Sequence, residues 1–193
     1  MKKLNKALFL SFALMACVNA QAQVVKFPME MSADATTIES VSNQKFQAQG
    51  ALAPVSVAGA QGNAWRLDGY SSCLQAKIDP TLVDGQSQMT FSLWVAPESY
   101  PVMRLDEDGE YFTTMAGNLK ASDLNVVESG DKGFAFRLGS RGTYMFICHV
   151  KGWKVMLKAS DKLARYKWNH LVVTVDAENK QVVMYNNGVQ VAT

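Results

Sequence analysis

Residues 168–188 read WNHLVVTVDAENKQVVMYNNG. Every second residue from Leu171 to Val175 is apolar, which is the period of a β-strand with one buried face. After a polar loop, the segment Gln181–Tyr185 predicts a second strand. Asn187 and Gly188 follow it, and Asn-Gly favours a tight type I′ turn because both residues tolerate positive φ angles. This part of the chain therefore predicts consecutive antiparallel strands.

The same alternation recurs elsewhere in the chain. It is found in Met89–Val95, in Gly133–Leu138 and around Val155, and Gly139–Gly142 predicts a turn into the apolar segment Tyr144–Val150. Residues 32–64 are poor in large apolar side chains and predict loops with brief edge strands. The only helix candidates are short, such as Asp161–Arg165. Many short strands separated by turn residues predict an all-β protein, an antiparallel β-sandwich or jelly roll.

The composition is that of a globular domain. The chain has 193 residues, of which 48% are hydrophobic and 19% charged, so it can build a sizeable core and is too apolar to be disordered. Three of the 19 Lys and Arg residues lie within the first six positions, which leaves 16 basic against 17 acidic side chains in the rest of the chain. This balance argues against a nucleic acid-binding surface.

Residues 1–22 predict a secretory signal peptide. Three lysines precede an apolar run, 7–18, that is too short to span a bilayer as a helix. Ala20–Ala22 supplies the small residues that a signal peptidase requires. The alternative is a lipobox in which Cys17 is acylated and becomes the mature N-terminus. Both alternatives predict an exported protein, which is periplasmic, secreted or an outer-membrane lipoprotein and touches a membrane only through that lipid.

Four segments resemble, in order along the chain, the sequence motifs of laminin-G-like, concanavalin A-like jelly rolls. They are Ala64–Tyr70 (AWRLDGY), Met89–Val95 (MTFSLWV), Trp168–Asp176 (WNHLVVTVD) and Val183–Gly188 (VMYNNG). The resemblance implies a concanavalin A-like jelly roll for residues 23–193. Domains of this kind continue past the Tyr-x-Asn-Gly hairpin with further strands, so the resemblance also implies that the fold is truncated at its C-terminal strands.

A narrower resemblance concerns Ser92–Met103, Gly133–Leu138 and Gly152–Val155. These segments are similar to the N-terminal laminin-G-like module of exported bacterial fructan hydrolases of the levanase and invertase type. The resemblance implies a non-catalytic accessory or carbohydrate-binding module of a glycoside hydrolase. Its partner would be a polysaccharide or a neighbouring catalytic domain beyond residue 193, because the catalytic signatures of that family are absent here. The alternative is a cell-surface module for protein binding or adhesion.

Aromatic side chains are the candidates for glycan binding, because exposed rings form platforms for the apolar faces of sugars. Tyr100, Tyr111 and Trp153 stand beside turn-forming residues and could serve in this way. The alternative for each of them is packing in the core or at its rim.

Metal binding has one candidate. Asp106, Asp108 and Glu110 form a dense carboxylate cluster beside Gly109 and could hold Ca²⁺ through alternating oxygen ligands. The alternative is a solvated turn, because the bidentate Glu of a calcium loop is missing from its position. No other cofactor is predicted, since the Cys and His residues do not have the spacing of zinc ligands.

The remaining reactive side chains do not indicate catalysis. Export would permit a disulfide between Cys73 and Cys148, and the alternative is two free thiols packed as small hydrophobic groups. The alternation places His170 on the face opposite Leu171. We expect His170 to be a hydrogen-bonded strand residue, because a lone His without a nucleophile or a ligand set makes no mechanism.

Overall fold

The computed structural model describes residues 26, 29, 36–38, 43–75, 86–101, 112–119, 133–150 and 152–193. The predicted signal peptide and the predicted acylation of Cys17 lie outside these residues. The sequence predicts one domain for residues 23–193, and the structure divides the chain into two compact units. Of the described residues, the smaller unit holds those up to Pro54 together with 67–75, and the larger unit holds the others.

The smaller unit contains one antiparallel sheet. Its strands are β1 (Thr36–Ile38), β2 (Lys45–Gln49) and β5 (Cys73–Leu74), in the order β1-β2-β5. Phe46 of the central strand is buried. β1 and β2 are short, as the lack of large apolar residues over 32–64 predicts, because such strands can bury little surface.

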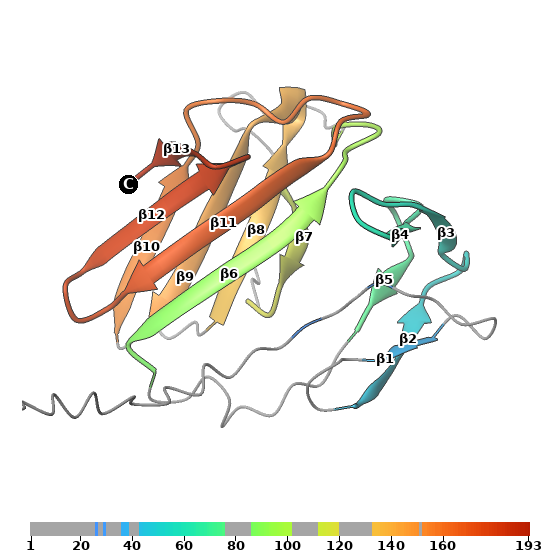
Figure 1. Ribbon diagram of the computed structural model, residues 1–193, viewed down its shortest axis with the longest axis horizontal. Helices are drawn as coiled ribbons and strands as arrows, with labels where there is room; N and C mark the ends of the chain where they lie inside the picture. The colour runs from blue at the N-terminus through green and yellow to red at the C-terminus, as the bar shows by residue number, and fades with distance from the viewer. Residues whose placement is uncertain are drawn as a thin grey trace, which may run out of the picture. The chain divides into compact units, whose positions relative to one another are not determined.

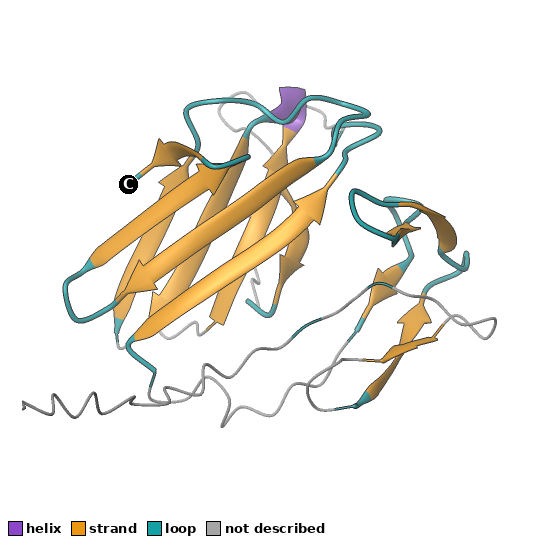
Figure 2. Ribbon diagram, in the orientation of Figure 1, coloured by secondary structure: helices purple, strands orange, loops and turns teal. Residues whose placement is uncertain are grey.

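Two four-stranded antiparallel sheets make up most of the larger unit (Figures 1 and 2). The first has the order β13-β12-β11-β6, and the second has the order β10-β9-β8-β7. Their bounds are β6 Gln88–Val95, β7 Phe112–Gly117, β8 Gly133–Gly139, β9 Tyr144–Val150, β10 Trp153–Lys158, β11 Asn169–Asp176, β12 Gln181–Asn186 and β13 Val189–Ala192. A hairpin of β3 (Val55–Ala58) and β4 (Asn63–Arg66) belongs to the same unit.

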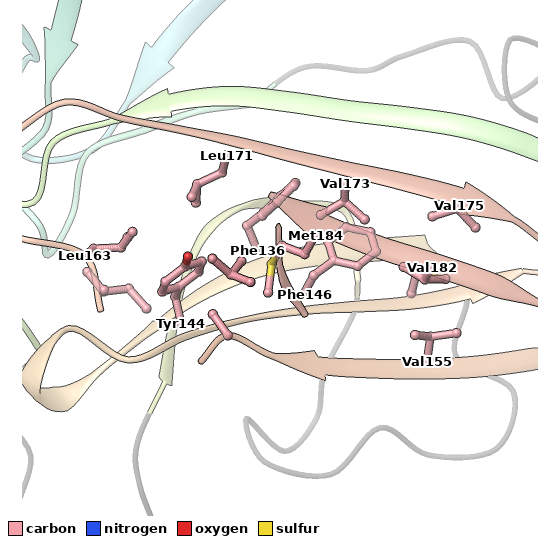
Figure 3. Packing of buried hydrophobic residues seen from close by; sticks show 14 of the residues in the cluster. Phe136, Tyr144, Phe146, Val155, Leu163, Leu171, Val173, Val175, Val182 and Met184 are labelled. Carbon is pink, nitrogen blue, oxygen red and sulfur yellow. The ribbon is translucent and has the colours of Figure 1, made fainter. Parts of the chain in front are cut away.

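The hydrophobic core lies between the two sheets, as Figure 3 shows at close range. The first sheet contributes Leu171, Val173 and Val175 from β11, which are almost completely buried. The second contributes Phe136 and Phe146, which are cross-strand partners with ring centroids 4.9 Å apart. Alternate residues of these strands therefore point into the core, which confirms the predicted antiparallel sandwich.

The central strands of the second sheet are buried on both faces. Ile147 and Met145 of β9 point away from the main core and pack with Phe112 in a second apolar cluster. The sequence alternation could not decide the direction of Cys148, because both faces of its strand are apolar. The structure places Cys148 in the main core.

The turns follow local chemistry where the sequence is explicit. Asn187 and Gly188 have φ angles of 50° and 81°, as the predicted type I′ hairpin requires.

The prediction of a short helix at Asp161–Arg165 is wrong, because the structure has an irregular loop there. Leu163 is buried, and its N–H donates to the carbonyl of Gly142. Tertiary contacts thus take the backbone group that a helix would have used.

Candidate functional site

An exposed aromatic pair lies on the outer face of the first sheet. Trp94 of β6 and His170 of β11 are direct cross-strand partners. Their ring centroids are 4.5 Å apart, and their planes are inclined by only 11°. Trp94 nevertheless keeps 44% of its surface exposed. Because His170 covers one face of the indole, the rest of the ring is a flat apolar surface open to a ligand.

Polar contacts fix the orientation of His170 beneath the indole. The Oγ of Ser92 lies 2.8 Å from the Nε2 of His170. The backbone N–H of His170 donates to the Oδ1 of Asn187 at 2.9 Å, and its carbonyl accepts from the N–H of Asn187 at 2.9 Å. The β12–β13 turn therefore clamps His170 from one side while Ser92 holds the ring. A platform held in this way loses little conformational entropy when a ligand binds.

The surface around the pair mixes apolar and hydrogen-bonding groups. Val172 is the cross-strand partner of both Ser92 and Tyr185, and Tyr185 is paired in turn with Gln190 of β13. Val172 and Tyr185 are half-buried, whereas Ser92 and Gln190 are exposed. These residues lie on β6, β11, β12 and β13, which Figure 1 shows side by side in the nearest sheet. We call this surface, defined by Ser92, Trp94, His170, Tyr185 and Gln190, the Trp94 face.

The opposite end of β11 is occupied by its own turn. Asp176 accepts hydrogen bonds from the backbone N–H groups of Glu178 and Asn179 and from the side chains of Asn179 and Gln88. These bonds, the backbone N–H of Asn179 above all, lower the pKa of Asp176 below its ordinary value. Asp176 thus organises the β11–β12 turn, and its lone pairs are already used.

Ser92 and His170 place a hydroxyl and an imidazole within hydrogen-bond distance, which is the first requirement of a Ser-His nucleophile. A Ser-His nucleophile requires a third group that orients the imidazole. Among the described residues, no carboxylate accepts a hydrogen bond from the Nδ1 of His170. The structure confirms the expected hydrogen-bonded strand residue on the face opposite Leu171.

Two of the three aromatic candidates from the sequence pack against the core. The hydroxyl of Tyr100 donates to the carbonyl of Leu163 at 2.6 Å, and the guanidinium of Arg165 lies 5.7 Å from its ring centroid. Trp153 is half-buried and also packs against the main core. The third candidate, Tyr111, lies outside the described residues.

The carboxylates Asp106, Asp108 and Glu110, predicted to bind Ca²⁺ or to form a turn, also lie outside the described residues. Among the residues that the structure does describe, no group of three His, Cys, Asp or Glu side chains could hold a metal ion.

The two cysteines are both free thiols in the structure. Cys73 is exposed, and Cys148 is buried. Burial raises the pKa of the Cys148 thiol to about 11. Because the thiolate is the nucleophilic form, Cys148 is an inert core residue.

A buried polar network ties the loop after β10 to the core. The hydroxyl of Tyr144 donates to one carboxylate oxygen of Asp161, and the amide of Asn186 donates to the other at 2.8 Å. Burial, followed by the bond to Asp161, raises the pKa of Tyr144 far above its usual range. The network is structural, because Tyr144 is completely buried and cannot reach a ligand.

Asp68 organises a loop of the smaller unit. Its carboxylate accepts from the hydroxyls of Ser71 and Ser72 and from the backbone N–H groups of Tyr70, Ser71 and Ser72. These bonds, that of the Ser71 hydroxyl first, hold the pKa of Asp68 well below its usual range. The segment Asp68–Ser72 is therefore a self-contained hydrogen-bonded loop.

Sequence reasoning missed Trp94 as a site residue, although a signal was present. In Met89–Val95 the alternation places Trp94 with Ser92 on the polar face of the strand. A large aromatic residue on the polar face of an alternating strand is not needed for the core, and it is therefore a candidate for binding.

Comparison with known families adds one match. A family model of the laminin-G type, described as the concanavalin A-like lectin/glucanases superfamily, matches residues 68–193. Searches of curated proteins and of solved structures gave no match. Within the described residues, no helix is long and apolar enough to cross a membrane.

Proposed function

The chain belongs to the concanavalin A-like lectin/glucanases superfamily, and we propose that it is a non-catalytic carbohydrate-binding module. One observation carries the proposal. Trp94 is exposed on an open sheet face, and its ring is held by stacking on His170. Family membership alone does not choose between glycan binding and adhesion, because one fold serves many functions.

The chemistry of the Trp94 face suits a sugar ring. The indole can cover the apolar C–H face of a sugar, while Ser92, Gln190 and Tyr185 offer hydroxyl and amide groups to its hydroxyls. The face lies across four paired strands, so it can accept a segment within a long polysaccharide as well as a chain end.

Binding is tested by calorimetric titration with a panel of polysaccharides that includes the fructans levan and inulin. We expect Trp94→Ala to weaken binding about thirtyfold, because truncating a central aromatic anchor costs about 2 kcal/mol. Tyr70→Ala is the matched control, since Tyr70 is fully exposed but belongs to the smaller unit. If Trp94→Ala binds as the wild type does, or if no polysaccharide binds, the proposal fails.

We also propose that the module is an accessory domain of an exported fructan hydrolase. This rests on the resemblance of Ser92–Met103, Gly133–Leu138 and Gly152–Val155 to such modules. The coding sequence downstream of Thr193 tests it directly. A β-propeller with hydrolase signatures would support the proposal, whereas tandem laminin-G repeats or a sorting anchor would favour an adhesion module.

Export itself is a proposal that the sequence supports. N-terminal analysis of the mature protein distinguishes its two forms. A start near Gln23 would show ordinary cleavage after Ala22, and an acylated Cys17 would show a lipoprotein. An intact Met1 on protein retained in the cytoplasm would contradict both.

A further inference from the structure

Three loops that are distant in sequence meet at one end of the sandwich. The N–H of Tyr166 donates to the carbonyl of Pro97 at 2.8 Å, and the N–H of Leu163 donates to Gly142 at 2.9 Å. Tyr100 adds its hydrogen bond to the carbonyl of Leu163. The loops after β6, β8 and β10 are therefore joined. Figure 2 shows the short 3-10 turn after β8 at this end, with the loops beside it.

Among the described residues, this end presents an excess of positive charge. Arg141, Lys162, Arg165 and Lys167 are all exposed, and no described carboxylate forms an ion pair with any of them. We call these four residues, together with Tyr166, the cationic tip.

Among the described residues of these loops, the carboxylates are Glu98 and Asp161. Glu98 pairs with Arg66 at 2.8 Å. Asp161 accepts from Tyr144 and Asn186 inside the fold. Glu98 is thus paired with a cation outside the tip, and the four cations of the tip outnumber the single charge of Asp161.

Tyr166 is the second unusual feature of this end. It is 73% exposed, with a φ angle of 58°. A bulky residue in the left-handed region is strained, and this side chain gains little packing in return. Arg165 precedes Tyr166 and Lys167 follows it. A protruding phenol between two cations resembles the arrangement in which aromatic rings sit at the headgroup level of a membrane.

We infer that the cationic tip binds an anionic phospholipid surface. Lys and Arg side chains only donate hydrogen bonds, and phosphate oxygens only accept them. The four cations of the tip therefore fit the acceptor oxygens of phosphate headgroups, and the exposed ring of Tyr166 fits the headgroup level of a bilayer. The tip shares no residue with the Trp94 face, and the inference does not depend on glycan binding.

The experiment measures binding of the purified protein to vesicles of equal parts phosphatidylcholine and phosphatidylglycerol, with vesicles of pure phosphatidylcholine as the reference. Cys17 is replaced by Ala throughout, so that no acyl chain contributes. We expect binding to the anionic vesicles only, weakening as salt is added. The triple variant Lys162→Gln, Arg165→Gln, Lys167→Gln should lose about a hundredfold in affinity, or about fivefold for each cation.

Lys180 supplies the matched control. It is an exposed cation in the turn beyond the far end of β11, about 25 Å from Lys167 by the rise of a strand. Lys167→Gln should weaken vesicle binding about fivefold, and Lys180→Gln should change it little. Tyr166→Gly relieves the backbone strain and should produce a smaller loss of binding that salt does not alter.

Three outcomes would overturn the inference. Equal effects of the Lys167 and Lys180 variants would mean that only net charge matters. Full binding by the triple variant would place the site elsewhere. Binding to polygalacturonate that depends on the tip, without binding to vesicles, would assign the tip to acidic polysaccharides. The Trp94→Ala variant should bind vesicles normally, so failure of the glycan proposal and failure of this one are distinguishable.

Discussion

Replacing Asp161 by Ala should destabilise the larger unit strongly, although Asp161 lies on a surface loop. Its carboxylate accepts from the Tyr144 hydroxyl and the Asn186 amide. Both donors are buried, with exposed fractions of 0% and 7%. A buried donor that loses its acceptor costs about 1–3 kcal/mol, so Asp161→Ala should lower the free energy of unfolding by about 2–6 kcal/mol.

A double-mutant cycle separates the unpaired donor from the lost bond. Tyr144→Phe removes the hydroxyl and should cost about 1.5–3 kcal/mol, the value of a hydrogen bond to a charged acceptor. The double variant has no orphaned hydroxyl. It should therefore be less destabilised than the sum of the single variants by about 1–3 kcal/mol.

Urea unfolding followed by tryptophan fluorescence measures these differences, with Glu178→Ala as a control at an exposed carboxylate. We expect the control to stay within about 0.5 kcal/mol of the wild type. The reasoning is refuted if Asp161→Ala matches that control, or if the two network variants are additive. Asp161→Ala should also weaken vesicle binding, because the loop that carries Lys162 and Arg165 loses its anchor.

Three further predictions concern pH and the core. Burial raises the folded-state pKa of Cys148 to about 11 from 9.0, and that of Tyr144 rises above 10.0. The resulting stabilisation is fully present below the unfolded-state pKa values and is lost as the pH rises through the folded-state values. The free energy of unfolding in urea should therefore fall by about 1.4 kcal/mol per pH unit for each group above its unfolded-state pKa, and Cys148→Ala should reduce this fall. Because the pKa of Asp68 is lowered, its carboxylate stays charged and holds its loop below pH 3.8, and it releases the loop only as the pH falls through the folded-state value. Asp68→Asn should speed amide exchange at Ser72, and unchanged exchange would contradict this. Phe146→Ala should cost about 3–5 kcal/mol in the same unfolding assay, because Phe146 is fully buried among three other rings; a loss under about 1 kcal/mol would show that the core is loosely packed.

The sandwich could be predicted from the sequence because the pattern within one segment predicts both a half-buried strand and the turn that follows. The apolar alternation of Leu171, Val173 and Val175 fixes which face is buried, and the Asn187-Gly188 dipeptide fixes the following turn. Where both faces are apolar, as in Tyr144–Val150, the period of two gives no direction, and only the packing of two sheets determines it.

The candidate sites depend on registers and contacts that no single segment encodes. The stacking of Trp94 on His170 requires β6 and β11 to be paired so that these two residues are opposite each other. The pattern within either strand leaves that pairing open. The cationic tip requires three loops to meet, and the segment Asp161–Arg165 even favours a short helix when it is considered alone. Its buried Leu163 and the bonds of Asp161 override that local preference.

The two proposed sites have one property in common, an exposed aromatic ring that the core does not use. In a two-layer sandwich the core takes every second side chain of a strand, and the remaining positions contribute little to folding. Trp94 occupies such a position, Tyr166 lies in the loop before β11, and each leaves a large apolar ring in water. Trp94 is stacked in place by His170, and Tyr166 is held in a strained backbone conformation. Folding gains little from either arrangement, so a ligand for each ring is the simplest account of why the sequence places it there.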